Sequence, residues 1–401
     1  MRVIFLNRFF YPDCSATSQI LSDLAFNLSA SKIDVCVIAS RQRYDDPRAG
    51  LKAFETVLGV RIYRAWTTHY GRGSLVGRFF DYLSFYLTSF WRLLILTSGK
   101  DTVVAMTDPP LTSVIAALAA KIRGARLINW TQDLFPEVAL VLRVKGVHGC
   151  AAHLLKNIRN TSLQAADVNV VIGKKMGQRI NDQGVETKRI KVIHNWSDGG
   201  MIKPLSHAEN PLRKEWGLER KFVVGYSGNM GRAHEFETIL GAAELLKDKK
   251  EIIFLFIGEG SQRALIEAQV KIRGLQNFLF KPTQAYEYLS HSLCVADIHL
   301  VTLRPELEGL IVPSKFYGIV AAGRPVIFIG DKEGEIGGLI LEGKCGYSVA
   351  SGETTDLKQR ILALAGDTEL VHRMGTIGRV FFERAFDKSI ALKVWREALL
   401  I

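Results

Sequence analysis

The chain has 401 residues, of which 48% are apolar and 23% charged, and its formal net charge is +12. This composition is typical of a globular protein of about two or three domains and excludes a chain that is mostly disordered. The positive charge predicts an anionic partner, which composition leaves open among nucleic acid, a phosphorylated small molecule and a membrane surface.

Five cysteines are spread along the chain without a CxxC pair: Cys14, Cys36, Cys150, Cys294 and Cys345. This pattern predicts buried, reduced thiols in a cytosolic protein, and neither a disulfide framework nor a zinc cluster. The apolar run at residues 3–6 is followed at once by Asn7 and Arg8. It is too short for the core of a signal peptide and predicts a first β-strand.

Short apolar runs alternate with segments of helical period along the chain. In the first half the expected strands are residues 3–6, 35–39, 60–63, 102–106, 126–130, 168–172 and 190–193, and the expected helices include 15–30, 111–122 and 174–183. The pattern restarts with strands at 222–226, 252–257, 298–302 and 326–329 and helices at 236–246, 262–272 and 315–322. The polar stretch 194–200 between the halves predicts a hinge. We therefore expect two Rossmann-like, doubly wound parallel-sheet α/β domains facing a cleft, with ligands at the carboxyl ends of the strands.

The segment at residues 75–96 differs from the rest because it is aromatic over a wide arc. Its polar residues recur at three- and four-residue spacing and form one narrow stripe: Gly77, Arg78, Asp81, Ser84, Thr88 and Arg92. The charged residues among them leave no uncharged run long enough to span a bilayer. Two alternatives remain. The helix is buried in the first core, or it docks on a membrane or lipid through the face of Phe79, Phe80, Phe90 and Trp91.

Two glycine-rich corners follow strands of the second half, at residues 227–231 and 258–260. Glycines at such corners let the backbone approach a phosphate closely, and Arg232 and His234 are nearby cationic or donor groups. Together the corners predict a nucleotide site, with a structural turn as the alternative. The loop after the first strand lacks a GxGxxG pattern, which disfavours a dinucleotide there.

Lys315 stands in the first turn of an expected helix that Pro313 or Ser314 opens. A cation there opposes the helix dipole, so we expect Lys315 to meet an anion; a solvated lysine is the alternative. Further along, Asp331 or Glu335 is placed to accept a hydrogen bond from a ribose hydroxyl.

In the first half, polar residues follow two buried strands. Residues 7–17 lead from the first strand into a helix whose first N–H groups suit an anion or a polar substrate. The alternative is an ordinary βα loop with Ser15 as the helix cap. Asp133 and Glu137 follow the strand 126–130 and are the carboxylate candidates for the cleft. Helix capping or a loop salt bridge is the alternative for both.

Six short motifs follow one another in an order that is recognisable. They are Phe10-Tyr11-Pro12-Asp13, Thr107-Asp108-Pro109-Pro110, Gln132-Asp133-Leu134-Phe135-Pro136-Glu137, His194-Asn195-Trp196, Tyr226-Ser227-Gly228-Asn229-Met230-Gly231 and Pro313-Ser314-Lys315-Phe316-Tyr317. This order resembles family 4 of the retaining glycosyltransferases, with the two-domain GT-B fold, and in particular enzymes of bacterial capsule, O-antigen or colanic-acid assembly. The resemblance implies an acceptor-binding domain at 1–198, a nucleotide-sugar-binding domain at 199–384 and a C-terminal helix at 385–401 that packs back on the first domain.

The resemblance also implies roles for individual residues. Donor binding falls to Ser227, Gly228, Asn229, Met230, Gly231, His234, Gly258, Glu259, Gly260, Lys281, Leu310, Ile311, Val312, Ser314, Asp331 and Glu335. Acceptor binding falls to Tyr11, Asp13, Ser15, Ala16 and Gln132, and catalysis to Asp133, Glu308 and Lys315. No metal ligand is expected.

Some loop positions depart from the family pattern. Ser15-Ala16 replaces a Gly-Gly pair, and the Gln132-Asp133 segment replaces a histidine of the catalytic pocket. Asn229 and His234 stand where an arginine and a lysine usually bind the donor phosphates.

The family's paired glutamates, eight positions apart, also depart from the pattern, since they fall at Leu310 and Gly318. Glu308 is expected to stand in for the first glutamate. Asp331 or Glu335 is expected to replace the second, which binds the ribose.

The resemblance implies a metal-independent, cofactor-free glycosyltransferase. It would move a hexose or an N-acetylaminosugar from a nucleotide-sugar, a UDP-sugar, to a lipid-linked or saccharide acceptor. Retention would use same-face attack with the leaving phosphate as base. The alternatives are a nucleotide-sugar epimerase of the same fold and a non-catalytic, membrane-associated nucleotide-sugar-binding protein. No basic run or recognition motif indicates nucleic acid.

The charge is unevenly distributed, because residues 1–200 hold 26 Lys and Arg against 15 Asp and Glu. A nucleotide site does not need this excess, whereas a domain that faces anionic lipid and a diphosphate-linked lipid acceptor does. We therefore expect a cytoplasmic protein that binds peripherally to the inner face of the membrane.

Overall fold

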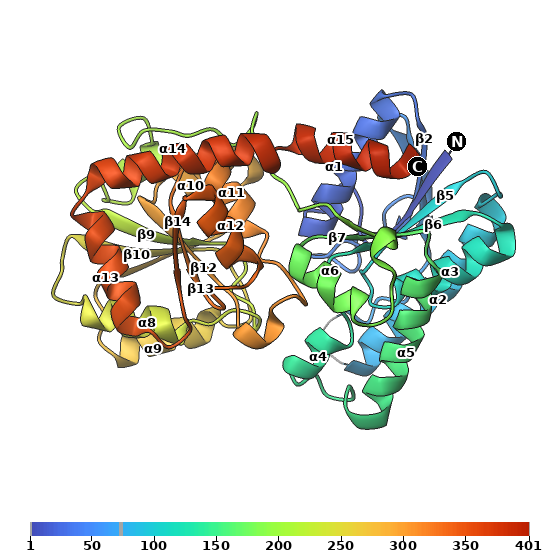
Figure 1. Ribbon diagram of the computed structural model, residues 1–401, viewed down its shortest axis with the longest axis horizontal. Helices are drawn as coiled ribbons and strands as arrows, with labels where there is room; N and C mark the ends of the chain where they lie inside the picture. The colour runs from blue at the N-terminus through green and yellow to red at the C-terminus, as the bar shows by residue number, and fades with distance from the viewer. Residues whose placement is uncertain (1, 72–74, 401) are drawn as a thin grey trace. The chain divides into compact units, whose positions relative to one another are not determined.

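Each half of the chain builds one β-sheet with helices on both faces, which confirms the predicted fold class (Figure 1). The computed structural model describes residues 2–71 and 75–400, so Met1 and Ile401, the outer ends of the expected domains, lie outside the described range. The chain divides into two units, Met1–His194 with Leu392–Ile401, and Asn195–Ala391. Each unit is described below by itself.

The first unit has an eight-stranded sheet in the order β3-β4-β2-β1-β5-β6-β7-β8. Its strands are β1 (Arg2–Leu6), β2 (Asp34–Ser40), β3 (Phe54–Val57), β4 (Val60–Ala65), β5 (Thr102–Met106), β6 (Arg126–Thr131), β7 (Val168–Val171) and β8 (Ile190–Val192). All neighbours are parallel except the edge strand β3, which pairs with β4 antiparallel. The sequence analysis missed β3 because this strand is short, contains two adjacent polar residues and has no buried residue, unlike the continuous apolar runs of the central strands.

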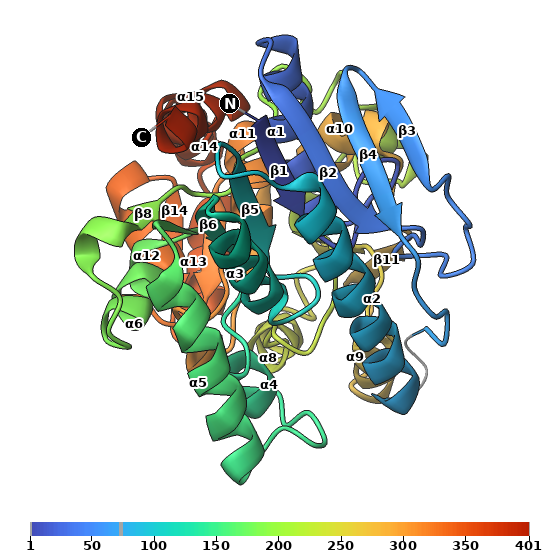
Figure 2. The same cartoon turned by 90° about the vertical axis from the view of Figure 1, so that its right-hand side faces the viewer.

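Helices cover both faces of this sheet. They are α1 (Ala16–Ala30), α2 (Leu75–Leu96), α3 (Thr112–Arg123), α4 (Glu137–Val141), α5 (Gly149–Ala165), α6 (Lys174–Asn181) and a 3-10 turn, η1 (Thr187–Arg189). Figure 2 shows α2, α3 and α5 side by side over one face. The end of α15 (Lys388–Leu400) packs on the opposite face, where the rings of Trp395 and Trp130 lie 4.4 Å apart and Arg396 donates to Asn27 on α1 at 2.6 Å.

The second unit has a six-stranded, wholly parallel sheet in the order β11-β10-β9-β12-β13-β14. Its strands are β9 (Phe222–Ser227), β10 (Ile252–Ile257), β11 (Phe278–Lys281), β12 (Ile298–Thr302), β13 (Val326–Ile329) and β14 (Gly346–Val349). Its helices are α7 (Pro211–Glu215), α8 (Glu237–Leu245), α9 (Arg263–Ile272), η2 (Tyr286–Tyr288), α10 (Leu289–Cys294), η3 (Pro305–Leu307), α11 (Lys315–Ala321), α12 (Glu335–Gly343), α13 (Thr354–Ala365) and α14 (Thr368–Ala385). The sequence reading missed β11 and β14, which are short and half exposed.

The strand order fixes where a ligand is expected in each unit. In the second unit the chain order reverses between β9 and β12, and in the first between β1 and β5. Loops leave the carboxyl ends of these neighbouring strands in opposite directions, so a crevice opens between them. The loop after β9 contains the first glycine corner, and the loop after β12 leads to Lys315, the residue expected to meet an anion.

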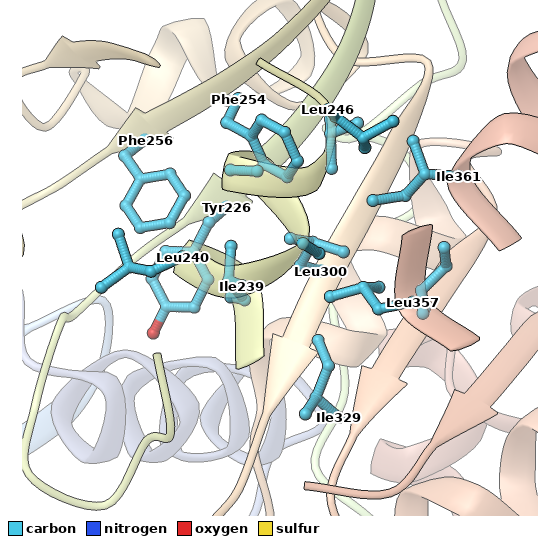
Figure 3. Close-up of a cluster of buried hydrophobic side chains, with 14 of the residues drawn as sticks. Tyr226, Ile239, Leu240, Leu246, Phe254, Phe256, Leu300, Ile329, Leu357 and Ile361 are labelled. Carbon is cyan, nitrogen blue, oxygen red and sulfur yellow. The ribbon is translucent and has the colours of Figure 1, made fainter. Parts of the chain in front are cut away.

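The core of the second unit is apolar and aromatic (Figure 3). Its labelled residues come from β9, β10, β12, β13, α13 and α8, together with Leu246, which follows α8 directly. Tyr226 and Phe256 stack in it with ring centroids 5.2 Å apart. The Tyr226 hydroxyl points out of the apolar cluster, toward the loops that follow the strands. The core therefore fixes the base of the expected site.

All five cysteines are free, but their burial differs from the prediction. Cys36, Cys294 and Cys345 are buried, whereas Cys14 and Cys150 are exposed, the first in the loop before α1 and the second in the first turn of α5. Within residues 2–71 and 75–400, no helix has the length and apolar character needed to cross a membrane.

Candidate active site

The two glycine corners of the second unit pack backbone against backbone. Gly258 and Gly260 have φ of +131° and +152°, and a Cβ on them would lie 2.3 Å from the Gly228 oxygen and 2.5 Å from the Met230 oxygen. The N–H groups of Gly228 and Met230 donate to the carbonyls of Ile257 and Glu259 at 2.9 and 2.8 Å. Only glycine fits these positions, so the corners form one rigid platform.

This pairing corrects part of the expected donor contact. The N–H groups of Gly228 and Met230 are engaged with the second corner, and the Met230 side chain is fully buried in the core. Met230 therefore stabilises the platform instead of binding a phosphate. The backbone donors of the exposed turn that remain candidates are those of Asn229 and Gly231.

Lys315 bridges the point at which the strand order reverses. It begins α11 after β12, yet its Nζ lies 2.5 Å from the hydroxyl of Tyr226 at the end of β9 and 3.8 Å from the ring centroid. The Tyr226 hydroxyl in turn donates to the Asn229 carbonyl at 3.0 Å. Burial lowers the pKa of Lys315 to about 7. Lys315 is therefore a poised cation beside the glycine platform.

Tyr226 is a functional candidate that the sequence reading did not single out. The signal was available, because a tyrosine, with its polar hydroxyl, stands at the end of an apolar strand directly before the glycine corner. A strand residue at the carboxyl end points either into the core or toward the ligand edge, and the sequence alone does not decide which.

His234 does not replace the family's lysine as a cation. Its Nδ1 lies 2.6 Å from the carbonyl oxygen of Thr302, and burial together with the Lys315 charge lowers its pKa to about 3. A neutral ring that donates through Nδ1 has an acceptor at Nε2. Of the two alternatives, a cationic group or a donor group, the cationic one does not hold at neutral pH, because the ring is buried next to another cation.

Glu308 is turned into the protein. Its Oε1 accepts from the N–H groups of Gly309 and Glu335 at 3.2 and 2.8 Å, and burial raises its pKa. A Cβ on Gly334 would lie 2.4 Å from its Oε2. Glu308 therefore caps the start of α12, which differs from the expected catalytic role, because a buried capping carboxylate is held away from solvent.

The two carboxylates proposed for the ribose lie at the start of the same helix. Asp331 is exposed, and its Oδ1 accepts from the Glu333 N–H at 3.0 Å. Glu335 is buried in the first turn of α12. Gly318, the position of the missing glutamate, has room for a Cβ, whose nearest neighbours would be at 3.6–3.9 Å.

The remaining donor candidates differ in accessibility. Leu310 and Val312 are buried, Ile311 is half-buried, and Ser314, Ser227 and Glu259 are more open, with Glu259 paired to Arg263. Lys281 ends β11 and lies over the Trp216 ring at 5.0 Å. Buried members of this group shape the loop after β12, and the open ones are available to a ligand.

In the first unit, Asp13 ties two loops together at the reversal point. Its Oδ1 accepts from the N–H and hydroxyl of Ser15, at 2.8 and 2.5 Å, and its Oδ2 accepts from the Tyr44 N–H at 2.5 Å. The Ser15 side chain does not cap α1, so the capping alternative does not hold for it. Asp13 and Ser15 position the loop, while Tyr11 and Ala16 are exposed on it.

Asp133 lies after β6, beside the end of β5. Its side chain lines a small pocket with Thr107 and Arg159, and its Oδ1 is buried without a hydrogen-bond partner among the described residues. Burial raises the pKa of Asp133 to about 6, aided by Asp108, while a bond from Thr107 opposes the rise. Such a carboxyl exchanges a proton near neutral pH.

The two neighbours of Asp133 in the motif have different surroundings. The Gln132 N–H lies 3.4 Å from the Thr107 hydroxyl oxygen. Glu137 accepts from Arg159 at 2.7 Å, so the salt-bridge alternative holds for Glu137. Asp133 is the carboxylate of this segment without such a partner among the described residues.

The two family matches divide the chain in the same place as the fold. The glycosyl transferase 4-like domain matches residues 16–196, and the glycosyl transferases group 1 domain matches residues 209–381. Together with the two parallel-sheet domains, this defines a glycosyltransferase of the GT-B class. The chain belongs to the glycosyltransferases that combine these two domains, as the resemblance in the sequence implied.

Relatives and solved structures agree with this assignment. The chain is 27% identical to WcaI of Escherichia coli K12, named for glycosyl transfer in colanic acid biosynthesis, over 77% of this chain and 76% of WcaI. It is 27% identical to WbjE of Pseudomonas aeruginosa, named as a glycosyltransferase, over 73% and 72%. The structure of Anabaena HepE in complex with UDP-glucose is 16% identical, covers 100% of this chain and 99% of HepE, and has a TM-score of 0.73. This last likeness concerns the fold.

Proposed function

We propose that the protein transfers a sugar from a UDP-sugar, with retention and without a metal, to a saccharide carried by a lipid. The observation that supports this most is the anion site at the reversal point of the second unit. There Lys315 stands beside a glycine platform that only glycines can form. A departing diphosphate needs fixed donors and a cation in a site of low dielectric constant.

Two further features support the proposal. HepE, which has the same fold, binds UDP and UDP-glucose. WcaI is named for glycosyl transfer in colanic acid biosynthesis. For enzymes of such polysaccharides, the resemblance implies an acceptor that is carried by a lipid. Asp133 is the candidate contact for the acceptor or the sugar in the first unit, and residues 199–384 and 1–198 are the donor and acceptor domains. A cytoplasmic, membrane-peripheral location follows from a lipid-borne acceptor.

The decisive experiment combines binding and product analysis. UDP-glucose, UDP-galactose and the two UDP-N-acetylaminosugars are screened by thermal shift, where a ligand of the folded state raises Tm. The sugar that binds is then incubated with the protein, with and without a lipid extract. We expect a glycolipid with the donor's anomeric configuration, unchanged by EDTA. Conversion of the UDP-sugar without an acceptor supports the epimerase, and binding without any turnover supports a non-catalytic protein.

Two observations favour the non-catalytic alternative. Gly318 lacks the side chain that binds ribose in the family, and His234 is neutral. The product analysis therefore has to accompany the binding screen.

A further inference from the structure

Helix α2 directs polar side chains toward the protein and exposes part of its apolar surface. Its polar residue Asp81 is 1% exposed and accepts from the Thr68 hydroxyl at 2.7 Å and from the N–H groups of Tyr70 and Gly71 at 3.0 and 2.9 Å. Ser84 accepts from the Thr68 N–H at 3.0 Å. The narrow polar stripe thus faces the protein, where it satisfies the backbone of the loop before the helix.

A second side of α2 is part of the core. Phe85 and Leu93 are fully buried against the sheet, and Phe90 is half-buried against the same cluster. The expectation that Phe90 belongs to an exposed face is therefore wrong, because it lies one position from the outward-facing Trp91. The core alternative and the docking alternative each describe one side of this helix.

The third side is apolar and exposed. Its residues, which we name the outer stripe, are Val76, Phe79, Phe80, Leu83, Leu87, Trp91 and Ile95, between 39% and 68% exposed. Apart from the adjacent pair Phe79 and Phe80, they recur every three or four residues, and they form one row about 30 Å long. Figure 2 shows α2 as the outermost of the three helices on its face of the first unit's sheet, on the β4 side. An apolar patch of this extent marks an interaction surface.

A basic, aromatic hollow of about 650 Å³ adjoins the outer stripe. Trp91, Leu87 and Ile95 of the stripe line it together with Trp66, Arg41 and Arg92, and none of its described lining residues is acidic. Trp66 is 55% exposed. The guanidinium of Arg92 lies 6.0 Å from the Tyr63 ring, and Arg41 donates through Nε to the Leu51 carbonyl, so both cations are held at the hollow.

We propose that the outer stripe and this hollow bind the surface of an anionic lipid bilayer. The stripe lies in the boundary between headgroups and acyl chains, with Trp66 and Trp91 at headgroup level and Arg41 and Arg92 against lipid phosphates. The charge of residues 1–200, 26 basic against 15 acidic, selects this occupant over a second copy of the chain, which would bring the same positive charge. The proposal rests on the proposed function and extends it, since it identifies the surface through which the protein reaches the bilayer that carries its acceptor.

The docking surface is connected to the loop expected to bind the acceptor. Asp81 lies 3.7 Å from Arg8, which follows β1 directly and donates to Gln42 at 2.8 Å. Arg8 also donates its N–H to the Asp108 carbonyl at 2.7 Å, across the reversal point of the first unit. Docking through α2 therefore holds this loop at a fixed depth relative to the bilayer.

The test is flotation of the full-length protein with phosphatidylcholine vesicles that contain or lack phosphatidylglycerol. We expect binding to the anionic vesicles, weakened by salt. The double variant Leu87→Gln/Trp91→Gln should lose at least about tenfold in partitioning, because two apolar side chains leave the interface. Arg41→Gln and Arg92→Gln should each lose about fivefold on anionic vesicles, which corresponds to about 1 kcal/mol per charge.

The matched control is Leu265→Gln/Ile272→Gln on α9, two apolar residues that are 58% and 75% exposed on a helix outside the proposed surface. It should float like the wild type, and circular dichroism should show all variants folded. Equal flotation of the Leu87/Trp91 variant and the wild type overturns the proposal. So does wild-type dimerisation in light scattering that this variant abolishes. Binding of UDP-glucose to the wild type in solution is measured in parallel. If the wild type does not bind UDP-glucose, the proposed function is contradicted, but the docking result still stands.

Discussion

The ammonium group of Lys315 lies 3.8 Å from the centroid of the Tyr226 ring and 2.5 Å from its hydroxyl oxygen. The two residues belong to different βα units, so their contact spans the reversal point of the second sheet. A buried ammonium is costly unless an anion meets it, and a phenol ring compensates only in part. The pair is therefore suited to bind an anion, and the protonation of Lys315 should increase when the ligand binds.

The first prediction concerns the pH dependence of donor binding. The pKa of Lys315 is about 7 in the free protein, and a bound diphosphate raises it. The affinity for UDP-glucose should therefore be constant below pH 7 and fall, by up to about tenfold per pH unit, as the pH rises above it. Calorimetry in buffers of different ionisation enthalpy should show proton uptake at pH 7–8.

UDP-glucose suits this measurement because its diphosphate diester does not titrate in this range. Lys315→Met should bind weakly and show no proton uptake. Uptake that persists in this variant would assign the effect to another group.

The second prediction is that Lys315→Met stabilises the free protein. The pKa of Lys315 is about 7 in the folded protein against 10.5 for an ordinary lysine. At or below pH 7 the folded protein therefore contains a buried cation, and the methionine variant should be more stable by roughly 1–3 kcal/mol. The gain should shrink as the pH rises from 7 toward 10.5, where the unfolded lysine also loses its proton. Urea unfolding at pH 6 and pH 9 measures both values; a variant less stable at pH 6 would contradict this account.

The third prediction concerns Asp133, whose pKa is raised to about 6 by burial. Between pH 4 and 6 the folded state binds more protons than the unfolded state, so this group lowers stability as the pH rises through that window. Asp133→Asn should therefore be more stable than the wild type at pH 7, by about 1–2 kcal/mol, and similar to it near pH 4. If the stability of Asp133→Asn and of the wild type changes with pH in the same way between pH 4 and 7, the pKa of Asp133 is not raised in the folded protein and this account is contradicted. Unchanged turnover in this variant would remove Asp133 from the catalytic residues.

The fourth prediction tests whether Gly260 is needed for the close packing of the glycine platform or only for its positive φ. Gly260→Ala places a Cβ 2.5 Å from the Met230 oxygen and should cost about 3 kcal/mol or more of stability and weaken UDP-glucose binding. Gly274→Ala is the control, since Gly274 also has positive φ, +63°, but nothing within 4 Å of a Cβ. It should cost about 1 kcal/mol and leave binding unchanged. Equal losses of stability and of UDP-glucose binding in both variants would show that the packing of the platform is not needed for the site.

The sequence predicted the fold class and most central strands because these are continuous apolar runs buried on both faces, a signal that is local along the chain. It missed the edge strands β3, β11 and β14, whose stability comes from one neighbour and whose residues are half exposed. The sequence points to Lys315 because a cation at a helix start is a local anomaly, and its role as an anion ligand stays a prediction. That its partner is Tyr226, and that His234 is neutral, depends on residues distant in sequence.

By itself the sequence determined two doubly wound domains, the order of the glycosyltransferase motifs and the places of the glycine corners. The tertiary structure decided which backbone groups those corners use for each other, why Glu308 caps a helix, and which side of α2 faces outward. The physical reason is the same in each case. Periodicity and turn chemistry act between near neighbours, whereas desolvation and hydrogen-bond pairing depend on what the fold brings into contact.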